Sequence, residues 1–159
     1  MILFKTLIFT LVGPGSFTVW IPYFLLSSQV ELFPFKTQAF RPVGAVLAAL
    51  GVAFYGWCAW NFAFVGQGTP AILDPPKKLV SRGLYRFVRN PMYIGMSLIM
   101  MGESIFFSSS TLWVYALLVW FGFHLFVLWY EEPHLRKKFG SPYEEYCRTV
   151  PRWIPRLKI

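Results

Sequence analysis

Two adjacent carboxylates, Glu131 and Glu132, stand where the last apolar run of the chain gives way to a basic tail. The apolar run is expected to form a helix, and the C-terminus of a helix disfavours anions, so the pair requires a cationic partner. The basic residues one turn further on, Arg136 to Lys138, are one source of positive charge, a bound cation is another, and plain solvation is a third interpretation. The pair is therefore a candidate binding site for a cationic ligand.

A second candidate lies in the basic and aromatic segment from Ser81 to Gly95, which leads directly into an apolar run. Asn90 is suited to cap a helix whose first residue is Pro91, because the first helical residue can lack its amide. The entrance of such a helix presents unpaired backbone donors and therefore attracts anions. The same pattern also fits a simple helix cap at the membrane surface. Three arginines of this segment can face lipid headgroups or an anionic ligand: Arg82, Arg86 and Arg89.

Weaker signals flank these two segments. Gly66-Gln67-Gly68 is a short glycine pair of a kind that occurs often at loop starts. In the tail, Pro133 predicts a helix break that lets the chain turn back towards residues 66–90, and Ser141 to Glu144 has the pattern of a capping box. The short helix begun there would present Tyr143 and Tyr146 for packing against lipid or for stacking on a purine.

The elements that must position these residues follow from an apolar composition. Hydrophobic residues make up 56% of the 159 residues and charged residues only 14%, against about 25% in soluble domains. We therefore expect an integral membrane protein with one domain over residues 1–159. The net charge of +8 does not indicate nucleic-acid binding, because the basic residues flank apolar runs. Cys58 and Cys147 lack the spacing of a disulfide framework or a metal site.

Four apolar runs predict an all-α bundle of four transmembrane helices, at about residues 3–26, 43–65, 91–107 and 112–130. The first run has no small-x-small cleavage site, so it is expected to be retained, as a helix that is kinked or broken at Gly13-Pro14-Gly15 and Pro22. Small residues between Gly44 and Gly51 favour close packing of the second helix. The third would rise only about 25 Å. The loop before the third helix and the tail, residues 131–159, would form a cap on the bundle.

The distribution of basic residues predicts the orientation. Lys5, five basic residues between Gly66 and Asn90 and seven in the tail fall on one side of the predicted membrane, against Lys36 and Arg41 on the other. The positive-inside rule places both termini and the cap in the cytoplasm, and a bacterial inner membrane is the expected location.

Two ionisable residues fall inside the predicted spans. Glu103 would cost about 2.5–3.5 kcal/mol at the lipid-facing centre of a span, so it is expected to face the bundle or to approach the far interface. His124 is expected to hydrogen-bond to a neighbouring helix. The two residues leave open an alternative in which the chain is a noncatalytic membrane subunit or a small transporter with a polar path.

Three ordered motifs resemble the superfamily of isoprenylcysteine carboxyl methyltransferases and phospholipid methyltransferases. They are Arg-Asn-Pro-Met-Tyr-Ile-Gly at 89–95, Tyr-Glu-Glu-Pro at 130–133, and Phe139-Gly140 followed by Tyr143 and Tyr146. The resemblance covers about residues 66–155. It implies an integral membrane enzyme that uses S-adenosylmethionine.

The resemblance also implies roles for particular residues. The cofactor-binding residues that it implies are Gly66, Gly68, Gly83, Tyr85, Asn90, Pro91, Tyr93, Glu131, Glu132 and Tyr143. Charge agrees with this assignment, because glutamates suit the sulfonium and ammonium groups of S-adenosylmethionine and a helix entrance suits its carboxylate. Asn90 and the Glu-Glu-Pro motif are closer to the phospholipid enzymes, whereas residues 139–155 are closer to the isoprenylcysteine type.

The expected function is transfer of a methyl group from S-adenosylmethionine to a lipid-like or prenylated acceptor drawn from the bilayer, by in-line displacement. If the acceptor is an isoprenylcysteine carboxylate, Arg148 or Arg152 would hold it. If the acceptor is a phospholipid amine, Glu131 or Glu132 would take its proton. The catalytic candidates are therefore Glu131, Glu132 and Arg152, and no metal site is expected.

Overall fold

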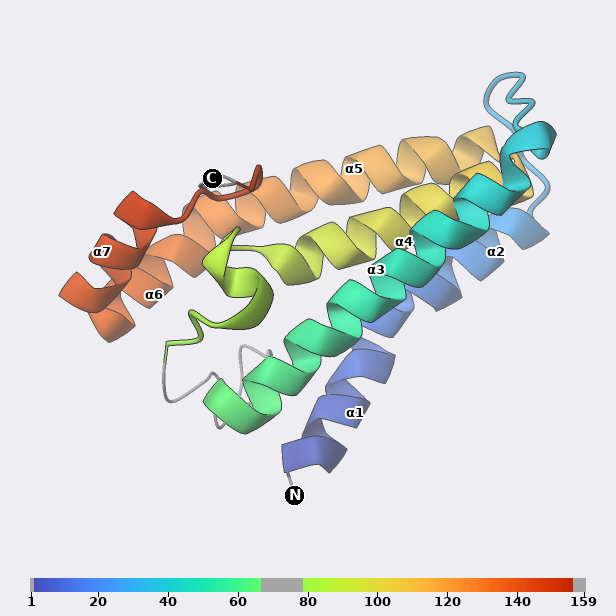
Figure 1. The fold of residues 1–159 in the computed structure, drawn as a ribbon. Helices are drawn as coiled ribbons and strands as arrows, with labels where there is room; N and C mark the ends of the chain where they lie inside the picture. The colour runs from blue at the N-terminus through green and yellow to red at the C-terminus, as the bar shows by residue number, and fades with distance from the viewer. Residues whose placement is uncertain (1, 67–78, 156–159) are drawn as a thin grey trace.

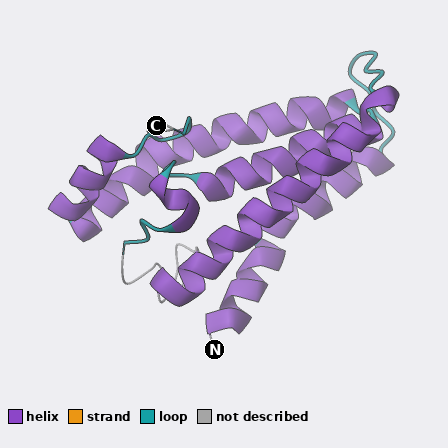
Figure 2. Cartoon of the chain, in the orientation of Figure 1, coloured by secondary structure: helices purple, strands orange, loops and turns teal. Residues whose placement is uncertain are grey.

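A computed structural model describes residues 2–66 and 79–155 of the chain, and these residues form helices and loops without a strand (Figures 1 and 2). The helices are α1 (Ile2–Val12), α2 (Ile21–Ser27), α3 (Arg41–Asn61), α4 (Pro91–Phe107), α5 (Ser110–Phe126), α6 (Glu132–Phe139) and α7 (Ser141–Thr149). Three π-helical turns lie at Ser16–Trp20, Phe62–Gly66 and Val127–Glu131, and 3₁₀ turns at Gln38–Phe40 and Gly83–Arg86. The all-helical prediction is confirmed for the described residues.

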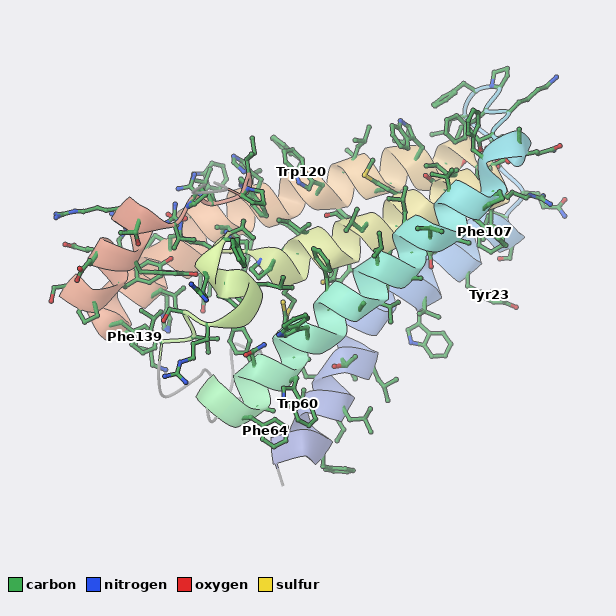
Figure 3. The ribbon with its side chains drawn as sticks, viewed as in Figure 1. Tyr23, Trp60, Phe64, Phe107, Trp120 and Phe139 are labelled. Atoms are coloured by element: carbon green, nitrogen blue, oxygen red, sulfur yellow. The ribbon has the colours of Figure 1, made fainter. Side chains whose placement is uncertain are left out.

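Three helical segments are long and apolar enough to cross a membrane: Thr6–Ser27, Gln38–Phe64 and Ser110–Phe139. α4 is also apolar but has 17 residues, and it packs between α3 and α5. Large exposed aromatic side chains lie near both ends of the bundle, with Trp60 and Phe64 at one end and Tyr23 and Phe107 at the other (Figure 3). Aromatic residues at two levels are typical of the two interfaces of a bilayer.

The regular α-helical pattern of the N-terminal apolar segment is interrupted at its glycines and proline, as predicted. α1 ends at Val12, and α2 begins at Ile21 after a π-helical turn. The hydroxyl of Ser16 donates to the carbonyl of Val12, and the hydroxyl of Thr18 donates to the carbonyl of Pro14 at 2.9 Å. These bonds pair carbonyls at the break, as an apolar environment demands of every backbone polar group.

Glycines bring α3 and α4 into close contact. A Cβ on Gly51 would lie 2.5 Å from the carbonyl oxygen of Gly95, and a Cβ on Gly102 would lie 2.6 Å from the carbonyl oxygen of Gly44. No side chain fits at such distances, so the two backbones touch, which confirms the close packing predicted from the small residues of α3. This contact fixes where α4 begins relative to the end of α3.

The predicted helix break at Pro133 is wrong. α5 continues through the π-helical turn Val127–Glu131 into α6, and Pro133 is the second residue of α6. In that turn the amide of Glu132 donates to the carbonyl of Val127, so the hydrogen-bond register has shifted before the proline is reached. The chain instead turns at Gly140, whose φ of +61° glycine adopts without steric cost.

The capping box predicted at Ser141 is not formed. Gly140 occupies the N-cap position of α7, and its turn draws Ser141 into the helix as the first helical residue. No side chain caps this helix end. The predicted short helix itself is present.

At the far end of the bundle, Glu31 fastens the loop between α2 and α3 to the start of α5. Its carboxylate accepts hydrogen bonds from the amide and the hydroxyl of Ser110 at 2.7 and 2.6 Å. The hydroxyl oxygen of Ser110 in turn accepts from the amide of Leu32 at 2.9 Å. Burial raises the pKa of Glu31, but the hydrogen bonds outweigh it and hold the pKa below its usual value. The carboxylate is therefore ionised at neutral pH.

Candidate active site

Four segments that are distant in the sequence meet at the end of the bundle where α6 and α7 lie (Figure 1). They are the end of α3, residues 79–90, the junction of α5 and α6, and residues 150–153. The amide of Arg89 donates to the carbonyl of Pro151 at 2.9 Å, and the hydroxyl of Tyr146 donates to the carbonyl of Tyr85 at 2.7 Å. These bonds hold residues 79–90 and the tail together, and we call these two segments the cap.

Glu132 lies at the centre of an ion-pair cluster in this cap. Two hydrogen bonds from Arg152 reach its two carboxylate oxygens, from Nε at 2.6 Å and from Nη2 at 2.9 Å. Nη1 of Arg89 lies 3.0 Å away, and Arg136 on the same helix lies at 3.9 Å. The Glu132 residue is only 4% exposed. The hydrogen bond to Glu132 raises the pKa of Arg152 further, so the guanidinium is permanently charged.

The cationic partner that the glutamate pair requires thus comes mainly from long-range contacts. Arg89 and Arg152 lie in two segments outside α6, and only the longest of the ion-pair distances belongs to the basic cluster that follows Glu132. The bidentate geometry of Arg152 is the stronger form of such a pair.

Glu131 has different surroundings from its neighbour. Its Oε2 accepts a hydrogen bond from the Tyr93 hydroxyl at 2.8 Å. Within residues 2–66 and 79–155, no lysine or arginine forms an ion pair with it. It is partly buried. A partly buried carboxylate without a cationic partner favours the approach of a positively charged group.

Asn90 occupies the N-cap position of α4, but the prediction that its side chain caps the helix is wrong. The side-chain amide instead donates to the carbonyl of Arg152 at 3.2 Å, because the tail passes directly over the helix start. Pro91 is the first residue of α4, as predicted, and it is buried. The entrance of α4 therefore has no side-chain cap.

The three arginines of residues 82–89 do not behave alike. Arg82 and Arg86 are exposed, as expected for residues that face headgroups. Arg89 instead turns inward, with 11% of its side chain exposed, and it contacts both Glu132 and Cys147. No local signal distinguishes Arg89 from the other two, so its place in the site was missed.

The tyrosines of the cap are packed inside the protein. Tyr143 and Tyr146 are buried against Val150, with Leu135 and Phe139 beside them. Burial raises the pKa of Tyr146, which keeps its hydroxyl protonated as a donor to Tyr85. The sequence left open whether these rings pack against lipid or stack on a purine. In the structure they pack, but against other protein side chains.

Gly83 allows the loop to approach the end of α3. Its φ is +61°, and a Cβ there would lie 3.1 Å from both Asn61 Nδ2 and Trp57 Nε1. Tyr85, two residues on, is buried in the same region and contacts Phe62 edge to face. Of the predicted glycine pair, Gly66 ends the π-helical turn after α3, and Gly68 lies outside the described residues.

Residues of the candidate site and of the segments next to it line several cavities. A cavity of about 660 Å³ opens between residues 79–87 and α7, lined in part by Ser81, Arg86 and Glu145. A second, of about 390 Å³, is almost wholly apolar and is lined in part by Tyr93. A third, of about 430 Å³, runs beneath Trp153. Of the predicted cofactor residues, Tyr93 lines the second cavity and Pro91 the third.

The two ionisable residues of the predicted spans lie apart. Nδ1 of His124 accepts a hydrogen bond from Trp153 Nε1 at 3.0 Å. The partner of His124 therefore lies in the tail, whereas a partner on a neighbouring helix was expected. Glu103 is partly buried in α4, and its Oε2 has no hydrogen-bond partner among the described residues. His124 lies about 21 Å along α5 from its start, whereas Glu103 lies about 6 Å before the end of α4. The two helices are joined at those ends, so the residues lie towards opposite ends of the bundle.

Comparison with known proteins adds an independent line of evidence. The model of the family described as phospholipid methyltransferase matches residues 40–142. Protein-S-isoprenylcysteine O-methyltransferase B of Arabidopsis thaliana is 33% identical over 79 residues, which cover 49% of this chain and 40% of that protein. The probable protein-S-isoprenylcysteine O-methyltransferase of Oryza sativa subsp. japonica is 35% identical over 78 residues, covering 49% and 41%.

A fungal relative gives the same picture. Protein-S-isoprenylcysteine O-methyltransferase of Schizosaccharomyces pombe is 35% identical over 79 residues, covering 48% of this chain and 33% of that protein. The chain thus spans about two fifths of the length of the plant relatives and a third of the Schizosaccharomyces pombe protein.

Proposed function

The chain belongs to the phospholipid methyltransferase family, and on that premise we propose that it is an integral membrane enzyme that methylates a lipid-like acceptor with S-adenosylmethionine. The observation that carries the proposal is the contrast between two neighbouring carboxylates. Glu132 is bound by arginines, whereas the Tyr93 hydroxyl is the one hydrogen-bond partner of Glu131 among the described residues. A site with one balanced and one unbalanced carboxylate suits a cationic ligand.

The residues at this end of the bundle fit S-adenosylmethionine. Glu131 would hold its positively charged groups, and the uncapped entrance of α4 would hold its carboxylate. When bound, the cofactor supplies an electrophilic methyl group. Tyr143 presents no open ring face in this structure, so a stacking role for it requires the cap to open.

The chain's own residues position the reactants and exclude water. Arg89 and Arg152 fasten the tail over the start of α4 through Glu132, which closes the site towards the solvent. If the acceptor is an amine, Glu131 accepts the proton that leaves its nitrogen. Nη1 of Arg152 takes no part in the bidentate pair with Glu132. If the acceptor is a carboxylate, this nitrogen would hold that carboxylate.

The family and the relatives favour different acceptors, a phospholipid and an isoprenylcysteine, and both remain within the proposal. We place the cap and both termini in the cytoplasm, as the distribution of basic residues indicates, and we propose a bacterial inner membrane as the location. The alternative of a transporter is not favoured, because Glu103 and His124 lie towards opposite ends of the bundle and His124 is engaged with Trp153.

Titration of the purified protein in lipid nanodiscs with S-adenosylmethionine tests this proposal. The wild type should bind saturably, and Glu131→Gln should bind roughly tenfold more weakly or worse, as expected for loss of a contact to a charged group. Glu132→Gln should also weaken binding, because it releases Arg89 and Arg152. Glu144→Gln, an exposed change on α7, is the matched control and should bind like the wild type.

Turnover completes the test. Incubation with labelled S-adenosylmethionine and a membrane lipid extract should yield a labelled lipid, and alkali-labile label would identify an ester whereas stable label would identify an amine. Absence of saturable binding by the wild type would refute the proposal. So would unchanged affinity and unchanged turnover in both glutamate variants.

A further inference from the structure

An apolar cavity of about 390 Å³ lies beside the Tyr93–Glu131 pair, between the broken N-terminal segment and the facing sides of α4 and α5. Gly13, Pro14 and Phe17 of this segment form one wall of the cavity. Met96 of α4 and Phe123 of α5 form the facing walls. The lining is almost free of polar atoms, so the cavity favours hydrocarbon over water.

The polar end of the cavity is the Tyr93 side chain. The ring of Tyr93 lines the cavity, and its hydroxyl donates to Glu131 at 2.8 Å. An amphiphile whose hydrocarbon chain fills the cavity therefore brings its polar group to Glu131, which has no ion pair with a described lysine or arginine. In the proposed methyl transfer, the acceptor atom must lie next to Glu131, because Glu131 would hold the positively charged groups of S-adenosylmethionine.

From these observations we infer that the cavity is the acceptor site and that the acceptor carries a single hydrocarbon chain; this inference rests on the proposed function. A methylene group occupies about the volume of a water molecule, roughly 30 Å³, so the cavity holds about thirteen of them. Two acyl chains of a phospholipid would need more than twice that volume. They leave the same glycerol and run side by side, so both would have to enter next to the polar group.

Aromatic rings in the walls of the cavity pack against one another. Phe123 packs against Tyr93 with ring centroids 4.8 Å apart and against Phe17 at 5.6 Å. These three rings lie together in the wall that includes the polar group, and the volume of about 390 Å³ limits what the cavity holds.

Gly122 of α5 provides a precise way to shorten the cavity. It is exposed at the rim, and a Cβ there would meet no atom within 4 Å. Leucine at this position would fill the space of about four methylene groups, at roughly 30 Å³ each, without a backbone clash. Gly56 of α3 is a matched control, because it is also exposed with no atom within 4 Å and does not line this cavity.

The test uses S-tetradecylcysteine with a diazirine at the chain end, photo-crosslinked to the protein in phosphatidylcholine nanodiscs without S-adenosylmethionine. Label should fall on residues that line the cavity. Unlabelled lysophosphatidylethanolamine, with one chain, should compete, whereas diacyl phosphatidylethanolamine with the same headgroup should not. Gly122→Leu should reduce labelling about tenfold or more, since each excluded methylene weakens burial severalfold. Gly56→Leu should label like the wild type.

A smaller substitution and a shorter probe show whether Gly122→Leu loses labelling because the cavity is shortened or because the protein misfolds. Gly122→Ala should reduce labelling only slightly, and Gly122→Leu should recover with an octyl probe, which a misfolded protein would not do. Equal competition by the one-chain and two-chain lipids would overturn the inference, as would labelling that is indifferent to Gly122→Leu. Failure of the proposed function has a separate signature, because S-adenosylmethionine would then fail to bind a protein whose cavity still takes the probe.

Discussion

Arg152 closes a bidentate ion pair on Glu132, with Nε 2.6 Å from one carboxylate oxygen and Nη2 2.9 Å from the other. The pair joins the tail to the start of α6. Asn90 donates to the carbonyl of the same arginine, so the start of α4 is joined to the tail at the same point. One residue of the tail thus connects the two elements that carry the candidate site.

Replacing Arg152 by lysine should loosen this connection although the charge is kept. Lysine offers a single ammonium group and cannot make two parallel hydrogen bonds to a carboxylate. We expect a loss of about 1–2 kcal/mol of stability, because Arg89 still balances Glu132, and weaker S-adenosylmethionine binding. Thermal unfolding in detergent and ligand titration measure the two effects. Arg148→Lys on the exposed face of α7 is the control, and equal behaviour of the two variants would contradict the prediction.

Replacing Tyr93 by phenylalanine should impair activity more than stability. The change removes the hydroxyl that donates to Glu131 and keeps the ring that packs on Phe123. Loss of a hydrogen bond to a charged group, about 1.5–3 kcal/mol, corresponds to a fall in kcat/KM of roughly tenfold to a hundredfold.

Tyr115→Phe is the matched control for this change. It also removes one tyrosine hydroxyl, which donates to the carbonyl of Phe17 and makes no hydrogen bond to Glu131 or Glu132. Methyl-transfer kinetics of the two variants measure the effect. A Tyr93→Phe enzyme as active as Tyr115→Phe would show that the hydroxyl does not position Glu131.

Alanine at Gly51 should destabilise the bundle. Its Cβ would lie 2.5 Å from the carbonyl oxygen of Gly95, a backbone atom that cannot move aside without shifting α4. Overpacking of this kind costs about 1–3 kcal/mol. Alanine at Gly56 meets no atom within 4 Å and should be neutral or stabilising by up to about 1 kcal/mol, since alanine favours the helix. Unfolding in detergent compares the two, and similar midpoints would contradict the packing described.

The contribution of Glu31 should depend on pH. Its folded-state pKa is held below the usual value by the hydrogen bonds from Ser110 and its neighbours, even though burial acts in the opposite direction. The carboxylate therefore stabilises the folded protein above the unfolded-state pKa, and that contribution is lost as the pH falls through the folded-state pKa.

Glu31→Gln should accordingly be less stable than the wild type at neutral pH. The expected loss is about 0.5 kcal/mol, because Glu31 is an exposed carboxylate at the N-terminus of α5. The difference should shrink towards zero below the usual pKa range of glutamate. Thermal unfolding at several pH values measures it. A difference that stays constant with pH would mean that the charge of Glu31 does not contribute.

Local sequence was sufficient for the class of this protein and for some of its element boundaries. Composition identified a helical membrane protein, because apolar runs of this length have no other way to pair their backbone groups. Proline and glycine act on the backbone where they stand, so the break at Gly13-Pro14 and the start of α4 at Pro91 were predicted correctly. The ordered motifs also identified the family, which the comparison then confirmed.

Only the tertiary structure decided which neighbours the site residues have. Glu131 and Glu132 are adjacent and chemically identical, yet one meets Tyr93 and the other meets two arginines, because they point to different sides of a continuous helix. Asn90 was expected to cap its own helix and instead binds a carbonyl 62 residues away. Pro133 was expected to turn the chain, but a preceding π-helical turn lets the helix continue to Gly140. The first two outcomes depend on which distant segments lie next to a polar group, and such contacts leave no pattern in the local sequence.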